Sequence, residues 1–193
     1  MTEPIPEPVP GEPTPPAIGG PKPGSTDRRR RLIIAIAIAV GVVVLDQLTK
    51  RWAVSALADG PIVLVDGWLE LDLTFNPGAA FSSLQGIGPL LAIAAVAVAG
   101  WITVLIRRRS TRTSEVVALA LILGGAVGNL VDRVTRGDGL LDGAVVDFIE
   151  PSFFPTFNVA DAAITVGAVL LVLVAVRHVP EGDDAPPAVT EGG

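Results

Sequence analysis

Four long apolar segments constrain how this chain can fold. They cover residues 32–54, 87–106, 116–134 and 157–176. Each is close to the roughly 20 residues that a helix needs to cross the hydrocarbon layer of a membrane. The mean hydropathy of +0.57 and the hydrophobic content of 50% agree with this interpretation. We therefore predict a mainly α-helical membrane protein with four transmembrane helices.

The first apolar segment allows a second interpretation. Arg28–Arg31 precede it and Ala56-Leu57-Ala58 follow it, which is also the pattern of a cleavable secretory signal peptide. Three further apolar segments follow, however. We therefore favour an uncleaved first transmembrane helix.

Two polar tails flank the apolar part of the chain. Residues 1–27 contain nine of the 17 prolines, and residues 180–193 carry four acids and no lysine or arginine. Such segments cannot bury an apolar core, so we predict two disordered tails around one four-span domain, residues 28–179. The tails account for the net charge of −6. The domain lacks the basic field of a nucleic-acid-binding protein.

Arginines indicate the orientation in the membrane. Four precede the first apolar segment, four lie between the second and the third, and Arg177 follows the fourth. Cytoplasmic loops of membrane proteins carry such an excess of positive charge. We therefore expect both termini, with their tails, in the cytoplasm, and the other two connections on the outer face.

Residues 61–76 follow a different pattern. Apolar and polar residues alternate from Trp68 onward, and Asp66-Gly67 is a turn signal. This alternation is typical of a β-hairpin, and the segment is too polar to cross a membrane. We predict a small extracytoplasmic hairpin between spans one and two.

Several polar side chains are predicted to converge on the outer face, at the ends of the apolar segments: Asp46, Asn76, Asp132, Asp147 and Asp161. A charge at membrane depth costs about 2.5–3.5 kcal/mol even on a lenient scale, so it usually has a function. Asp161 follows Asn158 by three residues, and the two could simply cap a helix. Asp147, in the apolar run 144–149, has no local partner, which indicates a long-range one.

Two further motifs have both a structural and a functional interpretation. Asp46 and Lys50 are four residues apart, so they share a helix face and could form an ion pair. In the third span, Gly124 and Gly128 permit close approach of a neighbouring helix. Asp132 could neutralise the adjacent arginine. One face of this span carries four residues that we expect to support a site: Gly125, Asn129, Asp132 and Arg133.

The residues available restrict the chemistry of a hydrolase. The chain has no cysteine, and His178, its only histidine, lies at the cytoplasmic end of the last span. Serine–histidine triads and HExxH zinc sites are therefore excluded on the outer face. A serine–lysine dyad would have to combine Lys50 with Ser55, Ser82 or Ser83. Paired carboxylates remain, since two such groups can share a proton, activate water and protonate a leaving group without metal or cofactor.

Five sequence blocks resemble the motifs of lipoprotein signal peptidase, also called signal peptidase II. They are Asp46–Lys50, Asn76–Phe81, Gly124–Arg133, Val145–Phe148 and Phe157–Asp161. The resemblance covers about residues 32–178, with the blocks in the family's order. It implies that Asp147 and Asp161 are the catalytic aspartates. It further implies supporting roles for a set of mostly polar residues: Asp46, Lys50, Asn76, Gly78, Asn129, Asp132, Arg133 and Asn158.

The resemblance also implies an activity and its partners. The family consists of aspartic endopeptidases of the bacterial inner membrane that cleave prolipoprotein signal peptides just before a diacylglyceryl-modified cysteine. Members carry an external β-cradle, which the predicted hairpin at 61–76 fits, and globomycin, a cyclic peptide, inhibits them. We accordingly expect a monomer that binds a lipidated prolipoprotein, membrane lipid and a globomycin-type inhibitor, and no nucleic acid.

Two other classes of function remain open from the residues alone. A small transporter or proton channel also places acids in a membrane, but here the acids gather at one face and no inverted repeat is visible. A non-catalytic scaffold that binds lipoproteins would share the same surface. Cleavage of a lipidated precursor peptide distinguishes a peptidase from both.

Overall fold

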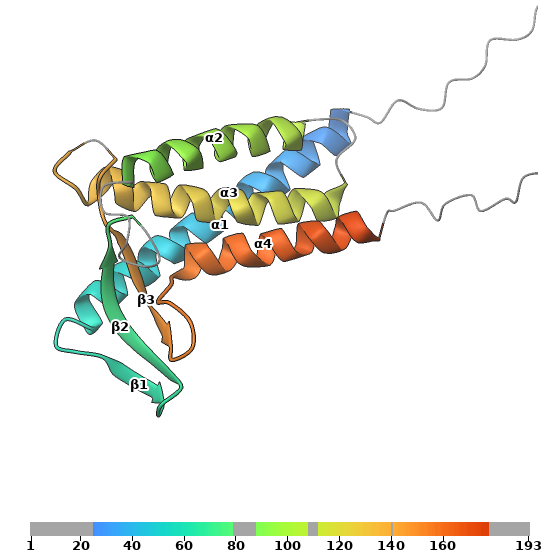
Figure 1. Cartoon of the computed structure of the whole chain (residues 1–193). Coiled ribbons are helices and arrows are strands. Elements are labelled where there is room, and N and C mark those ends of the chain that lie inside the picture. The colour runs from blue at the N-terminus through green and yellow to red at the C-terminus, as the bar shows by residue number, and fades with distance from the viewer. Residues whose placement is uncertain (1–24, 79–87, 108–111, 140, 178–193) are drawn as a thin grey trace, which may run out of the picture.

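The computed structural model describes residues 25–78, 88–107, 112–139 and 141–177. In these residues four helices form a bundle, and three strands form a sheet beside one end of it (Figure 1). The order along the chain is α1 (Ser25–Ala56), β1 (Ile62–Val65), β2 (Leu69–Asn76), α2 (Gly88–Arg107), α3 (Thr113–Thr135), β3 (Val145–Pro151) and α4 (Val159–Val176). The predicted tails lie outside the described residues, except that α1 already begins at Ser25.

Three of the described helices are long and apolar enough to cross a membrane. They are Thr26–Ala56, Thr113–Thr135 and Val159–Val176, which confirms the first, third and fourth predicted segments as span candidates. The remaining helix, α2, has 20 residues, and the apolar stretch within its fully described part is Ala92–Arg107. The helix itself is present, and its role as a fourth span stays a prediction.

Glycines let α3 pack closely against its neighbours. A Cβ atom on Gly124 would lie 2.7 Å from the Cβ of Val42 in α1, and one on Gly125 would meet the backbone oxygen of Ala160 in α4. Real Cβ atoms do not approach other atoms this closely. The predicted close approach at the third span is therefore confirmed, with α1 on one side of α3 and α4 on the other.

The sheet is antiparallel, with strand order β1-β2-β3. Its first two strands confirm the predicted hairpin, and Gly67 adopts a φ of 66° in the turn. The third strand was not predicted. In β3 the residues Val145–Phe148 are all buried, so the alternation that identifies a half-buried strand is missing from the sequence. This correction matters because β3 carries Asp147, paired in register with Thr74 of β2.

A small apolar cluster joins the sheet to the bundle. Ala53 and Leu57, near the end of α1, pack with Val146 and Phe148 of β3, and all four are at most 4% exposed. Since neighbouring residues of a strand point to opposite faces, Asp147 faces away from this cluster. Burial of the cluster thus holds β3 in place with the carboxylate of Asp147 turned to the other face.

The packing predicts an effect of adding one methyl group to α3. Gly125→Ala should lower the free energy of unfolding by about 1–3 kcal/mol, as overpacking usually does, because the new Cβ collides with the backbone of α4. Gly100→Ala in α2 is the matched control, since nothing lies within 4 Å of its Cβ position. Thermal unfolding of the purified protein in detergent measures both. Equal midpoints for the two variants would contradict the packing described.

Candidate active site

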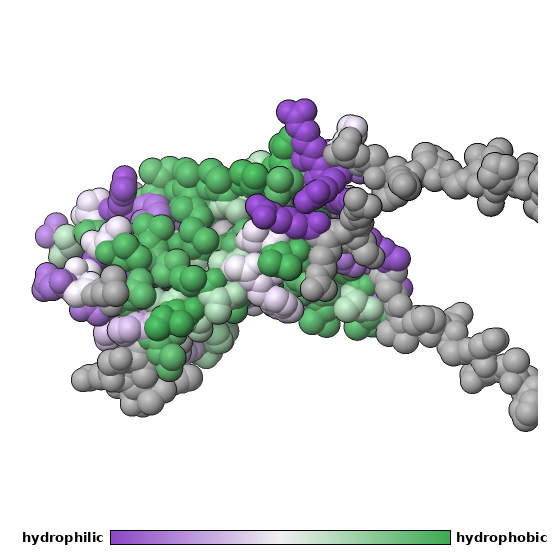
Figure 2. All heavy atoms as spheres, turned by 90° about the horizontal axis from the view of Figure 1, so that it is seen from above, coloured by the Kyte–Doolittle hydropathy of each residue, from purple (hydrophilic) through white to green (hydrophobic). Residues whose placement is uncertain are grey.

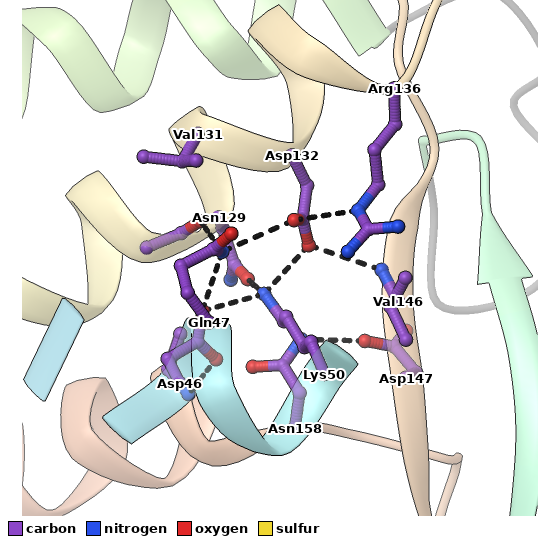
Figure 3. Close-up of polar contacts among 12 residues, drawn as sticks. Asp46, Gln47, Lys50, Asn129, Val131, Asp132, Arg136, Val146, Asp147 and Asn158 are labelled. Atoms are coloured by element: carbon purple, nitrogen blue, oxygen red, sulfur yellow. Dashed lines mark hydrogen bonds and ion pairs between the residues drawn. The ribbon is translucent and has the colours of Figure 1, made fainter. Parts of the chain in front are cut away.

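The predicted site residues come together where the sheet meets the bundle (Figure 3). They lie on five elements: the second half of α1, the end of β2, the last turns of α3, the middle of β3 and the start of α4. Six of their side chains are buried: Asp46, Lys50, Asp132, Arg133, Asp147 and Asn158. Residues up to 115 positions apart in the sequence thus form one polar cluster inside an otherwise apolar protein.

A buried lysine lies at the centre of this cluster. Lys50 Nζ is 2.9 Å from Asp46 Oδ2 and 2.8 Å from Asp132 Oδ2, and all three side chains are 0% exposed. The i, i+4 pair expected from the sequence is therefore confirmed. Asp132 pairs with Lys50 and with Arg136, whose Nε is 3.0 Å from Asp132 Oδ1, and not with the adjacent Arg133.

The two carboxylates of this cluster also bind backbone amides of other elements. Asp46 Oδ1 accepts a hydrogen bond of 3.0 Å from the N–H of Ala160, at the start of α4. Asp132 Oδ2 accepts one of 3.2 Å from the N–H of Val146 in β3. A buried charge is tolerated only when it is paired and hydrogen-bonded. The same bonds that satisfy these carboxylates fix α4 and β3 relative to α1 and α3.

Asn129 links the buried lysine to Asp161. Its Oδ1 accepts a hydrogen bond of 2.9 Å from Lys50 Nζ, and its Nδ2 donates one of 2.8 Å to Asp161 Oδ1. An ammonium group can only donate, so the amide oxygen must face Lys50. The amide nitrogen then necessarily faces Asp161.

Asn158 caps α4 and also contacts Asp147. Its Oδ1 accepts from the N–H of Asp161 at 3.0 Å, while its own N–H donates to Asp161 Oδ2 at 3.3 Å, which is a capping box. Its Nδ2 donates to Asp147 Oδ1 at 2.6 Å. The capping interpretation is therefore confirmed, and the same side chain also contacts the carboxylate of Asp147.

Asp147 lies in surroundings that favour its protonated form. It is 3% exposed, and its Oδ2 accepts a hydrogen bond of 3.0 Å from Asn76 Nδ2. Burial is the main cause that raises the pKa of Asp147 to about 6, and the charge of Asp161 raises it further. Hydrogen bonds from Asn76 and Asn158 and the charge of Lys50 act in the opposite direction.

A pocket of about 360 Å³ opens onto both acids. Asp147, Asp161, Asn76 and Arg133 contribute polar groups to its lining, and α2, α3 and α4 contribute apolar ones, among them Ala94, Ala95, Val98, Ile122 and Ile164. In the described part of the chain no three histidine, cysteine, aspartate or glutamate side chains form a group that could hold a metal ion. The pocket therefore presents two carboxylates and a guanidinium beside an apolar wall.

The remaining predicted residues also have defined places. Gly78 donates its N–H to Asn76 Oδ1 at 3.0 Å with a φ of 157°, which turns the amide nitrogen of Asn76 towards Asp147. Gly125 lies against Ala160 and Ile164 of α4. Arg133 donates to the backbone oxygen of Gly143 at 3.4 Å. Residues 79–81 of the Asn76 block lie outside the described residues.

The alternative serine–lysine dyad receives no support from the described residues. Lys50 Nζ contacts Asp46, Asp132 and Asn129. Ser55 is exposed and donates to the backbone oxygen of Trp52. Ser82 and Ser83 lie outside the described residues. No described serine therefore combines with the one lysine that could activate it.

The sequence analysis missed two members of the polar cluster. The Gln47 amide nitrogen donates to Asp46 Oδ2, Asp132 Oδ1 and the backbone oxygen of Gly128, each at 3.2 Å. Arg136 lies four residues after Asp132, which is the signal that could have predicted their ion pair. For Gln47 only its position next to Asp46 gave an indication.

Comparison with known protein families shows to which family this chain belongs. Residues 38–177 match the family model Peptidase_A8, described as signal peptidase (SPase) II. The chain belongs to the signal peptidase II family. It is therefore a membrane enzyme and a peptidase of the aspartic type.

Several proteins named lipoprotein signal peptidase are similar to this chain over most of their length. The lipoprotein signal peptidase of Streptomyces coelicolor is 38% identical over 165 residues, which are 83% of this chain and 79% of the relative. That of Rhodococcus jostii is 41% identical over 80% of this chain and 78% of the relative. That of Mycobacterium tuberculosis (strain H37Rv) is 39% identical over 82% and 78%.

Two solved structures share the fold of this signal peptidase II. Both are described as bacterial membrane enzymes determined by the in meso method, at 2.3 and 1.9 Å resolution. The first has a TM-score of 0.68 and 28% identity over 78% of this chain and 92% of its own. The second has a TM-score of 0.65 and 29% identity over 75% and 93%. The fold of this chain is thus shared with solved bacterial membrane enzymes.

The buried lysine predicts a large difference between two cation substitutions. Lys50→Met leaves the buried carboxylate of Asp46 without a cation and Asp132 with Arg136 alone, which should cost about 3–5 kcal/mol of unfolding free energy. Arg136→Gln removes a partly exposed partner of the same Asp132 and should cost less than about 1 kcal/mol. Denaturant titration of both variants in micelles measures the costs. A Lys50→Met variant as stable as Arg136→Gln would show that the cluster does not need its central charge.

Proposed function

We propose that this signal peptidase II removes the signal peptide from diacylglyceryl-modified prolipoproteins by cleaving just before the lipidated cysteine. In this proposal Asp147 and Asp161 are the catalytic pair. The observation that carries it is their common pocket: both acids line it, and an asparagine amide donates a hydrogen bond to each carboxylate. The relatives named above are lipoprotein signal peptidases, which supports the same substrate class.

Shared protonation gives the pair its chemistry. The raised pKa of Asp147 and the nearby charge of Asp161 favour a state in which the two carboxyls hold one proton between them. The ionised carboxylate takes a proton from a water molecule, whose oxygen attacks the scissile carbonyl carbon. The protonated carboxyl gives its proton to the departing nitrogen as the C–N bond breaks. The scheme needs neither a metal nor a cofactor.

The surrounding residues act as positioning groups in this scheme. Asn76, Asn129 and Asn158 hold the two carboxylates, and Gly78 orients the first of these amides. A further group keeps the framework together: Asp46, Lys50 and Asp132 by their charges, and Gly125 by its missing side chain. Arg133 lines the pocket with N–H groups to spare, so we assign it to binding a substrate carbonyl oxygen.

The apolar wall of the pocket suits a signal peptide that stays in the membrane. Ala94, Ala95 and Val98 leave room for a peptide beside α2. The acyl chains of the modified cysteine can remain in lipid, where each buried CH₂ contributes about 0.8 kcal/mol to binding. A globomycin-type cyclic peptide would occupy the same pocket and inhibit the enzyme. No second copy of the chain is needed, so we propose a monomer.

Charge placement supports an outward-facing site. The arginines Arg28–Arg31, Arg107, Arg112 and Arg177 lie at the bundle end opposite the sheet. By the positive-inside rule that end is cytoplasmic. The catalytic pocket and the sheet then lie at the extracytoplasmic face of the bacterial inner membrane, and both terminal tails lie in the cytoplasm. There the sheet serves as the external cradle beside the substrate.

The catalytic assignment predicts the loss of activity without loss of the fold. Asp147→Asn and Asp161→Asn should each reduce cleavage of a lipidated precursor peptide by about 10²–10⁴-fold or more, because proton transfer to or from the reacting atoms fails. Asp66→Asn, an exposed acid in the hairpin turn, is the matched control and should cleave at the parent rate. Thermal unfolding verifies that all three variants fold. Parent-like turnover by either of the first two would refute the pair.

The pKa of Asp147 predicts the pH dependence of that cleavage. With a pKa of about 6, Asp147 holds its proton below this pH and loses it above, so the rate should fall with increasing pH above about 6. Asn76→Ala removes a hydrogen bond that lowers this pKa, so the falling limb should move to higher pH. Thr74→Ala, on the same strand, should leave it in place. A limb that moves to lower pH in Asn76→Ala would contradict the assignment.

A further inference from the structure

A second hollow, which we name the arginine-end groove, lies on the bundle between α1, α2 and α3. Its volume is about 460 Å³, and it shares no lining residue with the catalytic pocket. The α1 side is a stripe of apolar residues spaced by four, which therefore follow one face of the helix: Leu32, Ile36, Val40 and Val44, each between 37% and 55% exposed. Leu123 and Val127 of α3 line it as well.

The groove has an apolar body and one cationic end. Thr103 and Arg107 are its polar lining residues. Thr103 Oγ1 donates to the backbone oxygen of Ala99 at 2.8 Å within its own helix, so it has no need of an external acceptor. Arg107, the last residue of α2, is exposed. An occupant that matches this lining is apolar along most of its length and carries a negative charge beside Arg107.

The surroundings of the cationic end also favour a negatively charged occupant. In the described ranges around it, 25–32, 107, 112–115 and 177, seven arginines accompany two acids, Asp27 and Glu115. Figure 2 shows hydrophilic residues at this end of the bundle and a largely hydrophobic surface along the helices. Basic pockets between membrane helices on the cytoplasmic side bind anionic lipid headgroups.

The dimensions suit one acyl chain. From Leu32 to Val44 the stripe covers twelve helical steps, about 18 Å along the axis. We propose that the arginine-end groove binds an anionic phospholipid, with one acyl chain along the α1 stripe and the phosphate at Arg107. Such a lipid fills the space between α1 and α2, which both pack on α3 through the core formed by Ala35, Ile102, Ile106 and Leu119.

Competitive lipid retention tests this proposal. The full chain is extracted from nanodiscs that contain phosphatidylglycerol and phosphatidylcholine with identical acyl chains in equal amounts, and retained lipid is counted by native mass spectrometry. We expect phosphatidylglycerol to be retained several-fold over phosphatidylcholine. Arg107→Gln should bring the ratio close to one. Arg177→Gln, an exposed arginine at the end of α4 outside the groove, should leave the ratio unchanged.

A second pair of variants tests the acyl chain. Ile36→Trp places a large side chain in the groove and should lower retention of phosphatidylglycerol, whereas Ile33→Trp, equally exposed on the same helix but not in the lining, should not. Equal retention of the two lipids by the parent protein would overturn the proposal, and so would an equal effect of Arg107→Gln and Arg177→Gln. A dimer mass that Ile36→Trp abolishes would overturn it too, since a second copy would then cover the groove. If Ile36→Trp does not fold, the arginine pair alone decides.

Discussion

Everything at the polar end of this protein depends on one ammonium group buried between two carboxylates. Lys50 holds Asp46 of its own helix and Asp132 of α3, and each of these acids then binds a backbone N–H of a further element, α4 or β3. The desolvation of three charges is offset only when all are paired at once. The three charges depend on one another, so the positions of α1, α3, α4 and β3 relative to one another are fixed together.

The two proposed catalytic acids reach their common pocket by different local structures. Asp161 is the third residue of α4, and a capping box holds it at the helix N-terminus, where a negative charge is favoured. Asp147 lies in the middle of a strand, where neighbouring side chains are packed in the apolar cluster on the opposite face. One carboxylate therefore depends on helix capping and the other on sheet register. Asn158 is the side chain that joins both.

The helices and most residues of the polar cluster could be predicted from the sequence, but the third strand could not. Long apolar segments and glycine spacing are local signals, and they led to the helices and to the close contact of α3 with its neighbours. β3 is a continuous buried run whose pairing partner lies about 70 residues earlier, so no local pattern distinguishes it from other apolar sequence. Gln47 was missed for the same reason, because two of its three acceptors, Gly128 and Asp132, become its neighbours only after folding. The family motifs named the site residues without their contacts.

The asparagine amides have a consequence for how the site exchanges protons with its surroundings. Among the described residues, the protein groups that hydrogen-bond to the carboxylates of Asp147 and Asp161 are all N–H groups of amides, from Asn76, Asn129 and Asn158. An amide keeps its hydrogen at ordinary pH and cannot pass it on. The ammonium of Lys50 is thus electrically close to the pair yet insulated from it as a proton source. In the proposed mechanism, the acids therefore regain their proton between turnovers through the mouth of the pocket, from solvent or from the bound peptide.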